Sequence, residues 1–144
     1  MKIRAAFALI AVTLLGLLAR EASACGHCDE DKVASTYDHA VVSRALSQGH
    51  HVAFFKIEGP ISAGDATRRA IEDAVYAVPG VDNRSARISL DTLTVSFSFD
   101  PGRVSMTAIN TQLDRKLSGR KLSVKPLRVM EAPGDLKTAK SSAP

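Results

Sequence analysis

The sequence predicts an α+β fold in which a four-stranded antiparallel sheet carries two helices, with one extra helix ahead of them. Three observations predict this class. Four short segments rich in hydrophobic and β-branched residues, bounded by Gly, Pro and Asp, are typical of strands. Two longer segments repeat their hydrophobic residues with helical spacing. Their order is strand, helix, strand, strand, helix, strand, which is the split-βαβ arrangement.

Length and composition limit the function classes. The 144 residues suit one domain with a modest core. The 19 Lys and Arg exceed the 15 Asp and Glu by a surplus that is too small and too scattered to predict nucleic-acid binding. No Gly-rich phosphate loop and no Ser/His/Asp pattern is present, and Trp is absent. We expect a protein that is not an enzyme and has no nucleic-acid partner.

Residues 1–24 have the pattern of a secretory signal peptide. A basic start precedes an unbroken hydrophobic run over residues 5–19, and Ala22 and Ala24 are the small residues that signal peptidase requires. A membrane anchor is the alternative, but this run is short for a span of about 20 residues. We expect cleavage after Ala24, a periplasmic or secreted chain, and Cys25 as its first mature residue.

A cysteine directly after the cleavage site also fits a lipoprotein, in which Cys25 carries a lipid and anchors the chain to the membrane. Lipoprotein signals usually place Leu three residues before that cysteine, where this sequence has Ala22. The polar Arg20 and Glu21 also separate the hydrophobic run from the cysteine. We favour plain cleavage; lipidation would leave Cys28 as the only thiol.

Residues 25–50 combine a Cys-Gly-His-Cys motif with a predicted helix over residues 28–48. Acidic residues fill its first turn, where the helix dipole favours negative charge, and Gly49 ends it. A hydrophobic stripe of helical spacing comprises Val33, Ala34, Tyr37, Val41, Val42, Ala45 and Leu46. This helix could cover the open face of the sheet, dock on a partner or form a dimer.

Residues 51–130 carry the βαββαβ order. Strands are predicted at 51–59, 85–90, 93–99 and 121–130, and helices at 65–78 and 104–117. Asp65 is the predicted N-cap of the first helix. Pro126 implies an edge position or a β-bulge for the last strand. The polar tail at 131–144 is predicted to be disordered. The result is a ferredoxin-like α+β fold.

Three segments of this region resemble the heavy-metal-associated (HMA) domain. They are FKIEG at 55–59, AIEDAVYAVPGV at 70–81 and ISLDTLTVSFSFDP at 88–101. The family includes periplasmic mercury-binding proteins, copper chaperones and the N-terminal modules of metal-pumping ATPases. The resemblance covers residues 52–130 and implies a ferredoxin-like fold.

The resemblance ends at the family's metal site, which lies after the first strand in the pattern G-M-x-C-x-x-C. Here the loop reads GPISAGD, so that Pro60 replaces the Met, Ser62 the first Cys and Asp65 the second. The resemblance therefore implies the fold without the family's own ligands. We expect Ser62 to be a loop residue and Asp65 a helix cap.

Both cysteines of the chain lie instead in the motif Cys25-Gly26-His27-Cys28. Thiolates at this spacing can hold one soft ion with imidazole as a further ligand, and Cu(I), Zn(II) and Hg(II) suit such ligands alike. We predict a transition-metal site, with copper among the candidates, at Cys25, His27 and Cys28. An antiparallel return of helix and strand would bring it towards the loop at 60–65. A metal transporter or another envelope protein is the expected partner.

Other interpretations of the motif stay open. A free amine at Cys25 with His27 in position three can bind Cu(II) or Ni(II) in a square plane. CGHC is also the active-site sequence of protein disulfide isomerases, but a thioredoxin fold needs a strand before the motif. The pair could close as a disulfide, or the domain could be an interaction module without a metal. His39, His50 and His51 are expected to be packed, solvated or turn residues.

Overall fold

The structure is a computed structural model that describes residues 28–62 and 64–133. Its elements are α2 (Asp29–Ser35), α3 (His39–Ser47), β1 (His51–Glu58), α4 (Asp65–Tyr76), β2 (Arg87–Ser89), β3 (Thr94–Phe99), α5 (Met106–Leu117), the 3₁₀ helix η1 (Ser118–Arg120) and β4 (Ser123–Met130). Across these ranges, no helix is long and apolar enough to cross a membrane. The predicted signal peptide, Cys25, His27 and the tail from residue 134 lie outside the described residues.

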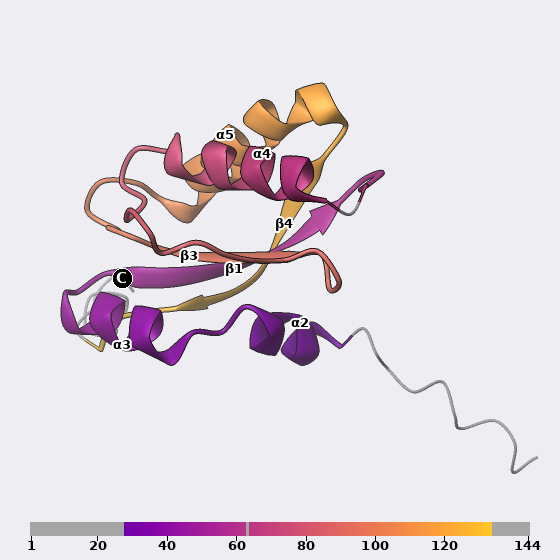
Figure 1. Ribbon diagram of the computed structural model, residues 1–144. Coiled ribbons are helices and arrows are strands. Elements are labelled where there is room, and N and C mark those ends of the chain that lie inside the picture. Colours follow the sequence, from indigo (N-terminus) through magenta and orange to yellow (C-terminus); the bar gives the residue numbers. More distant parts are fainter. Residues whose placement is uncertain (1–27, 63, 134–144) are drawn as a thin grey trace, which may run out of the picture.

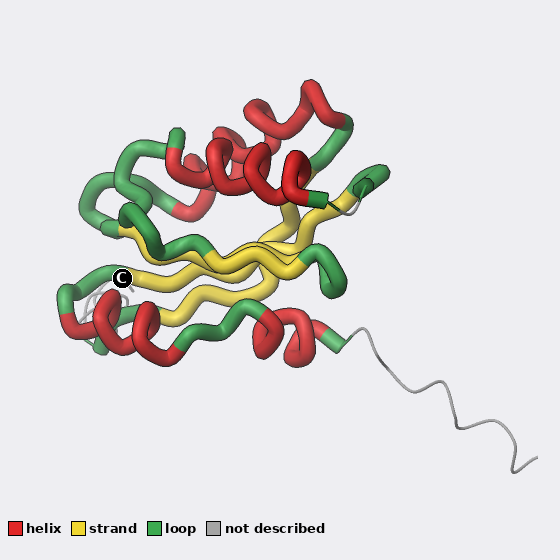
Figure 2. The backbone as a smooth tube through the Cα atoms, in the orientation of Figure 1, coloured by secondary structure: helices red, strands yellow, loops and turns green. Residues whose placement is uncertain are grey.

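The sheet lies between two layers of helices, as Figures 1 and 2 show. Its strand order is β2-β3-β1-β4. Every neighbouring pair is antiparallel, and β1 is central, with Val52 opposite Ser98 of β3 and Met130 of β4. Helices α4 and α5 lie on one face, and α2 and α3 lie on the other. The predicted ferredoxin-like α+β fold with an added N-terminal helical segment is confirmed.

The last strand, β4, lies at the edge of the sheet. Its register with β1 shifts between Phe54 and Phe55, and Pro126 is the residue opposite Phe55. Proline has no N–H for the ladder, so it is tolerated where pairing is irregular or absent on one side. Pro126 predicted an edge position or a β-bulge, and the structure has both an edge strand and a register shift at this point.

The main core lies between the sheet and helices α4 and α5. Three β1 side chains, Ala53, Phe55 and Ile57, point into it and are fully buried. The rings of Phe55 and Phe97 stack with centroids 5.6 Å apart. The helices contribute Ile71, Ala74, Val75, Ile109, Leu113 and Leu117. This core packs α4 and α5 against one face of the sheet, which is the arrangement that the resemblance to HMA domains implied.

A second core lies on the opposite face, beneath α3 and α2. It consists of the buried residues Val33, Val42, Ala45, Val52 and Phe54, with Leu46, Leu127 and Met130 packed against them. Of the three roles considered for the N-terminal helical segment, covering its own sheet is therefore the one observed. As a consequence β1 is buried on both faces, and Val52 through Phe55 are at most 1% exposed.

The polar face of β3 is buried under the same segment. All six residues of the strand are buried, including Thr94, Ser96 and Ser98. Each hydroxyl donates a hydrogen bond: Ser96 Oγ to the Thr36 carbonyl at 2.7 Å, Ser98 Oγ to Asp82 Oδ2 at 2.6 Å and Thr94 Oγ1 to a neighbouring carbonyl. Buried polar groups require such partners, so this face of β3 is suited to contact with the N-terminal helical segment rather than with solvent.

The single helix predicted over residues 28–48 is wrong. The chain forms two helices, because Asp38 caps the second one and its Oδ1 accepts from the backbone N–H of Ala40 at 2.9 Å and Val41 at 3.1 Å. The Ser96 hydroxyl donates a hydrogen bond to the carbonyl of Thr36, the C-cap residue of the first helix. The break turns Tyr37 away from the predicted stripe, and it is 44% exposed.

The predicted cap of α4 is also wrong. Gly64 occupies the N-cap position without a side-chain hydrogen bond, and Asp65 is the first residue of the helix, in the turn where its charge suits the dipole. Helix α5 likewise begins at Met106 rather than at residue 104, since the Ser105 side chain accepts from a backbone N–H in the first turn.

The carboxylate of Asp38 joins α3 to the sheet. Backbone N–H donation from Val41, and then the Arg87 guanidinium, hold the pKa of Asp38 below its usual value of 3.8. Arg87 Nε lies 2.8 Å from Asp38 Oδ2. Because the folded-state pKa is lowered, the stabilisation is complete above the unfolded value and is lost as the pH falls through the folded value.

We expect Phe54→Ala to lower the free energy of unfolding by about 3–5 kcal/mol, because it empties the second core. Tyr37→Ala is the matched control on the same side of the sheet, and its change should stay within about 0.5 kcal/mol. Urea unfolding followed by circular dichroism measures both. Equal losses for the two variants would contradict the packing of α3 on the sheet.

We expect Asp38→Asn to keep the capping oxygen and to lose the attraction for Arg87. Its urea midpoint should lie below that of the parent protein at neutral pH. The difference should shrink as the pH falls from 3.8 through the lowered pKa of folded Asp38, because the parent carboxylate then becomes protonated too. Asp91→Asn, at an exposed turn position, is the control. A difference that does not change with pH would rule out the ion pair as its cause.

Candidate metal-binding segment

Cys28 is the part of the Cys-Gly-His-Cys motif that the structure describes. It is exposed and occupies the N-cap position of α2 with extended backbone (φ −62°, ψ 144°). Its carbonyl accepts the backbone N–H groups of Asp31 at 3.1 Å and Lys32 at 3.3 Å. The helix therefore fixes the backbone of Cys28 while its side chain faces solvent.

The surroundings of Cys28 are acidic. Asp29, Glu30 and Asp31 form the exposed first turn of α2. Lys32 is only 8% exposed, and its Nζ lies 3.4 Å from Asp29 Oδ1. Three carboxylates against one ammonium give this end of α2 a net negative charge, which favours a cation over an anion beside the thiol.

Helix α2 is anchored on β3 and the β2–β3 turn. Val33 enters the second core and is 6% exposed. The hydroxyls of Ser35 and Thr92 lie 2.6 Å apart, and Ser96 holds the Thr36 carbonyl. None of these partners was identified from the sequence, since each bond joins residues at least 57 positions apart. These contacts fix Cys28 relative to the sheet.

The sequence predicted that the N-terminal helix and the first strand run antiparallel and bring the motif towards the loop at 60–65. The structure shows part of this arrangement. Ser35 contacts Thr92, and the carbonyl of the next residue, Leu93, accepts the N–H of Ile57 near the end of β1 at 2.7 Å. Figure 1 shows α2 at the end of the sheet where β1 leads towards α4, but on the opposite face. Cys25 and His27 lie outside the described residues, so the displaced site as a whole stays a prediction.

The loop that binds metal in HMA domains has a structural role here. Ser62 is exposed and its carbonyl accepts from Thr67 Oγ1 at 2.7 Å, which confirms it as a loop residue. Gly59 has φ +127°, and a Cβ there would collide with the Lys121 carbonyl. The loop keeps the close packing of the fold, but its side chains offer no thiol.

A pair of lysines lies on the sheet face that α2 covers. Lys56 Nζ donates to Glu58 Oε1 at 2.9 Å. This hydrogen bond and the charge of Lys56 lower the pKa of Glu58, and Lys125 on β4 adds a smaller effect of the same sign. Glu58 is therefore ionised and engaged by cations, which makes it a poor candidate for a metal ligand.

The described histidines lie away from Cys28. His39 begins α3, and its Nδ1 is 3.5 Å from the Tyr37 hydroxyl. His50 Nδ1 is 2.8 Å from Asp82 Oδ2, a partner for which the sequence gives no signal. His51 meets the Phe99 ring edge-on at 5.6 Å. Within residues 28–62 and 64–133, no group of three or more His, Cys, Asp and Glu could hold a metal ion.

Comparisons with known proteins give structural similarity only. No protein-family model and no curated protein matches the chain. It is similar to a copper binding domain from HMA7, a P-type ATPase (19% identity, TM-score 0.46, 55% of this chain and 96% of that chain). It is similar to the N-terminal domain of a potential copper-translocating P-type ATPase from Bacillus subtilis (22% identity, TM-score 0.45, 58% of this chain and 94% of that chain). It is also similar to oxidized MerP from Ralstonia metallidurans CH34 (14% identity, TM-score 0.44, 55% of this chain and 99% of that chain). The strand order β2-β3-β1-β4, with α4 and α5 on one face, gives residues 51–130 the HMA-like, ferredoxin-like fold that the sequence resemblance implied.

Proposed function

We propose that the protein binds a soft transition-metal ion through Cys25, His27 and Cys28 and hands it to a partner in the periplasm. The observation that carries this proposal is the exposed Cys28 at the start of a helix that is anchored on an HMA-like sheet. Both cysteines of the chain belong to the motif at this position. The protein acts as a carrier and not as an enzyme.

The ligand chemistry supports a soft ion. Two thiolates at C-x-x-C spacing with an imidazole between them suit Cu(I), Zn(II) and Hg(II). Ligand thiols must lose their protons on binding, so affinity should rise with pH. The carboxylates of Asp29, Glu30 and Asp31 add negative charge beside Cys28, which favours a bound cation.

Exposure and anchoring together support transfer. A carrier must present its ligands to an incoming partner, and Cys28 is exposed. It must also limit how far the ligands move, and α2 is fixed through Val33, Ser35 and the Thr36 carbonyl. A metal transporter or another envelope protein is the partner that this role implies.

The first experiment is a native intact mass of the protein recovered from its own cell envelope. We expect a chain that begins at Cys25, carries no lipid and holds one metal ion. A lipidated Cys25 would leave one thiol and contradict the two-thiolate site. A cleaved, metal-free chain lighter by two hydrogens would indicate a disulfide and favour the redox or structural interpretation.

The ligand assignment predicts that Cys25→Ser/Cys28→Ser changes metal content from one ion per chain to none, because both thiolates are lost. Ser62→Ala/Asp65→Asn changes the loop that binds metal in HMA domains and is the matched control; it should keep one ion. Dialysed protein is analysed by inductively coupled plasma mass spectrometry. If the control variant loses the ion and the cysteine variant keeps it, the site lies in the loop.

A further inference from the structure

Helix α2 is held on the sheet by fewer buried side chains than the other described α-helices. Helices α3, α4 and α5 each bury three hydrophobic residues, whereas α2 buries Val33 alone. Helix α2 also has only seven residues, and its N-cap position has no side-chain capping bond. So short a helix is not stable by itself in water, because most helical stability in proteins comes from packing. The docked state of α2 therefore depends on a small set of contacts.

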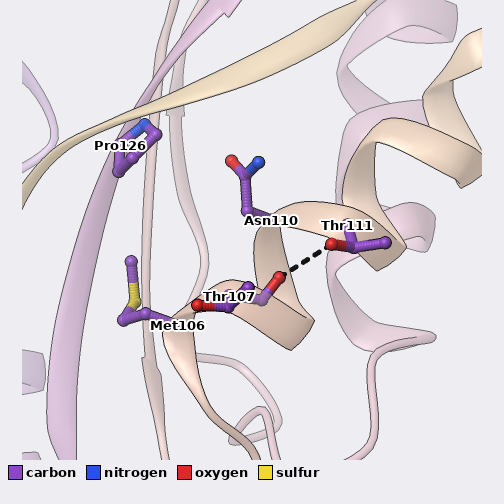
Figure 3. A pocket seen from close by; sticks show the side chains of 5 residues that line it. All are labelled: Met106, Thr107, Asn110, Thr111 and Pro126. Atoms are coloured by element: carbon purple, nitrogen blue, oxygen red, sulfur yellow. Dashed lines mark hydrogen bonds between the residues drawn. The ribbon is translucent and has the colours of Figure 1, made fainter.

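Helix α5 shows how a helix of the main core is held. Asp114 Oδ1 accepts the backbone N–H of Val124 on β4 at 2.8 Å. Figure 3 shows the outer side of this contact, where a shallow cavity of about 250 Å³ is lined by Met106, Thr107, Asn110, Thr111 and Pro126. Beside this cavity, α5 still buries Ile109, Leu113 and Leu117. It is thus bound to the core and to the edge strand at once, which α2 is not.

Two hydrogen bonds join the C-terminal end of α2 to β3 and the turn before it. Ser35 Oγ lies 2.6 Å from Thr92 Oγ1 at an exposed position, and Ser96 Oγ donates to the Thr36 carbonyl at 2.7 Å. The groups beneath this end of α2 are therefore hydroxyls. A hydroxyl can exchange a protein partner for water with a small net change in free energy. Loss of these two bonds would cost little if α2 left the sheet.

Two buried groups of this segment favour release. Thr36 is 3% exposed, and its Oγ1 atom has no hydrogen-bond partner among the described residues. A buried hydroxyl without a partner destabilises the docked state, because water would bond to it if it were exposed. Lys32 is also buried, and burial of an ammonium group carries a desolvation penalty even when a carboxylate is near. Undocking of α2 would hydrate both groups.

Tyr37 lies between the two helices and can act as a pivot (Figure 1). Its side chain is exposed and belongs to neither hydrophobic core. The next residue, Asp38, already belongs to α3, because it caps that helix and binds Arg87. Three buried side chains hold α3 on the sheet independently of α2. A rotation at Tyr37 would therefore move residues 28–36 and leave α3 docked.

We propose that residues 28–36 form a strap that undocks from the sheet as one unit, pivoting at Tyr37, while α3 stays in place. The docked state predominates, because undocking withdraws Val33 from the second core and opens that core to water. With a rise of 1.5 Å per residue, the pivot carries Cys28 on the order of 10 Å from the sheet. The role of the strap in transfer rests on the proposed function: undocking would let the Cys-Gly-His-Cys motif enter a recessed acceptor site on a partner.

The test is native-state hydrogen exchange of the full mature chain, ¹⁵N-labelled, metal-free and with reduced thiols. We expect the amides of Lys32, Thr36 and Tyr37 to share one opening free energy and to exchange at least about a hundredfold faster than those of Val42 and His50 in the α3 layer. Protection that rises steadily from Lys32 to Tyr37 would indicate fraying from the N-terminus. Protection equal to that of α3 would indicate a fixed helix. Either result would overturn the strap.

A matched pair of core variants tests whether α2 opens without α3, since Val33 and Val42 are each 6% exposed. Val33→Ala removes a contact of the docked state alone, so exchange in α2 and α3 should rise by the same factor, about tenfold. Val42→Ala removes a contact that persists when the strap undocks. It should speed exchange in α3 and leave α2 within about twofold of the parent protein. Equal acceleration of both helices by Val42→Ala would show that they open together and would contradict the proposal.

The unpartnered hydroxyl predicts a variant with the opposite sign. Thr36→Val keeps the shape of the side chain and removes the buried hydroxyl, so it should slow exchange in α2 by about fivefold or more. Thr94→Val is the matched control, because the buried Thr94 hydroxyl does donate, to the Thr92 carbonyl at 3.1 Å, and its loss should not slow α2. Exchange in α2 that fails to slow in Thr36→Val would overturn the proposal.

These exchange measurements use metal-free protein, so they decide the strap independently of the metal site. A native mass without metal would overturn the proposed function and leave the undocking of α2 standing. Equal protection of α2 and α3 would overturn the strap and leave the metal site standing.

Discussion

The burial of β1 on both faces is the constraint on which the rest of the structure depends. A four-stranded sheet with two helices leaves one face open, and here that face carries Val52 and Phe54, both at most 1% exposed. The helices α2 and α3 must therefore stay docked, since exposing these side chains to water costs about 1.5–3 kcal/mol each. Polar β3 residues extend the same interface, and Ser96 links it to the break between the two helices. The N-terminal segment is thus part of the folded domain.

This arrangement changes where a metal would be presented. In the HMA pattern the thiols lie on the loop between the first strand and first helix, whereas here that loop has Ser62 and Asp65. Cys28 lies at the same end of the sheet but in the α2–α3 layer, so the sheet separates the two positions. A partner that accepts metal from the Cys-Gly-His-Cys motif would therefore approach the α2 side and not the α4 side.

The sequence was a good guide to features that depend on local pattern. Hydrophobic spacing predicted the order of the strands and helices, and Pro126 predicted the edge and bulge of β4, because these signals act within a few residues. The break after α2 was missed since its stabilising contacts, Asp38 with Arg87 and Thr36 with Ser96, join residues 49 and 60 positions apart. The Asp38 cap does have a local signal, an aspartate just before a hydrophobic helix. Of the predicted metal ligands only Cys28 lies in the described residues, and its pairing with Cys25 and His27 stays a prediction.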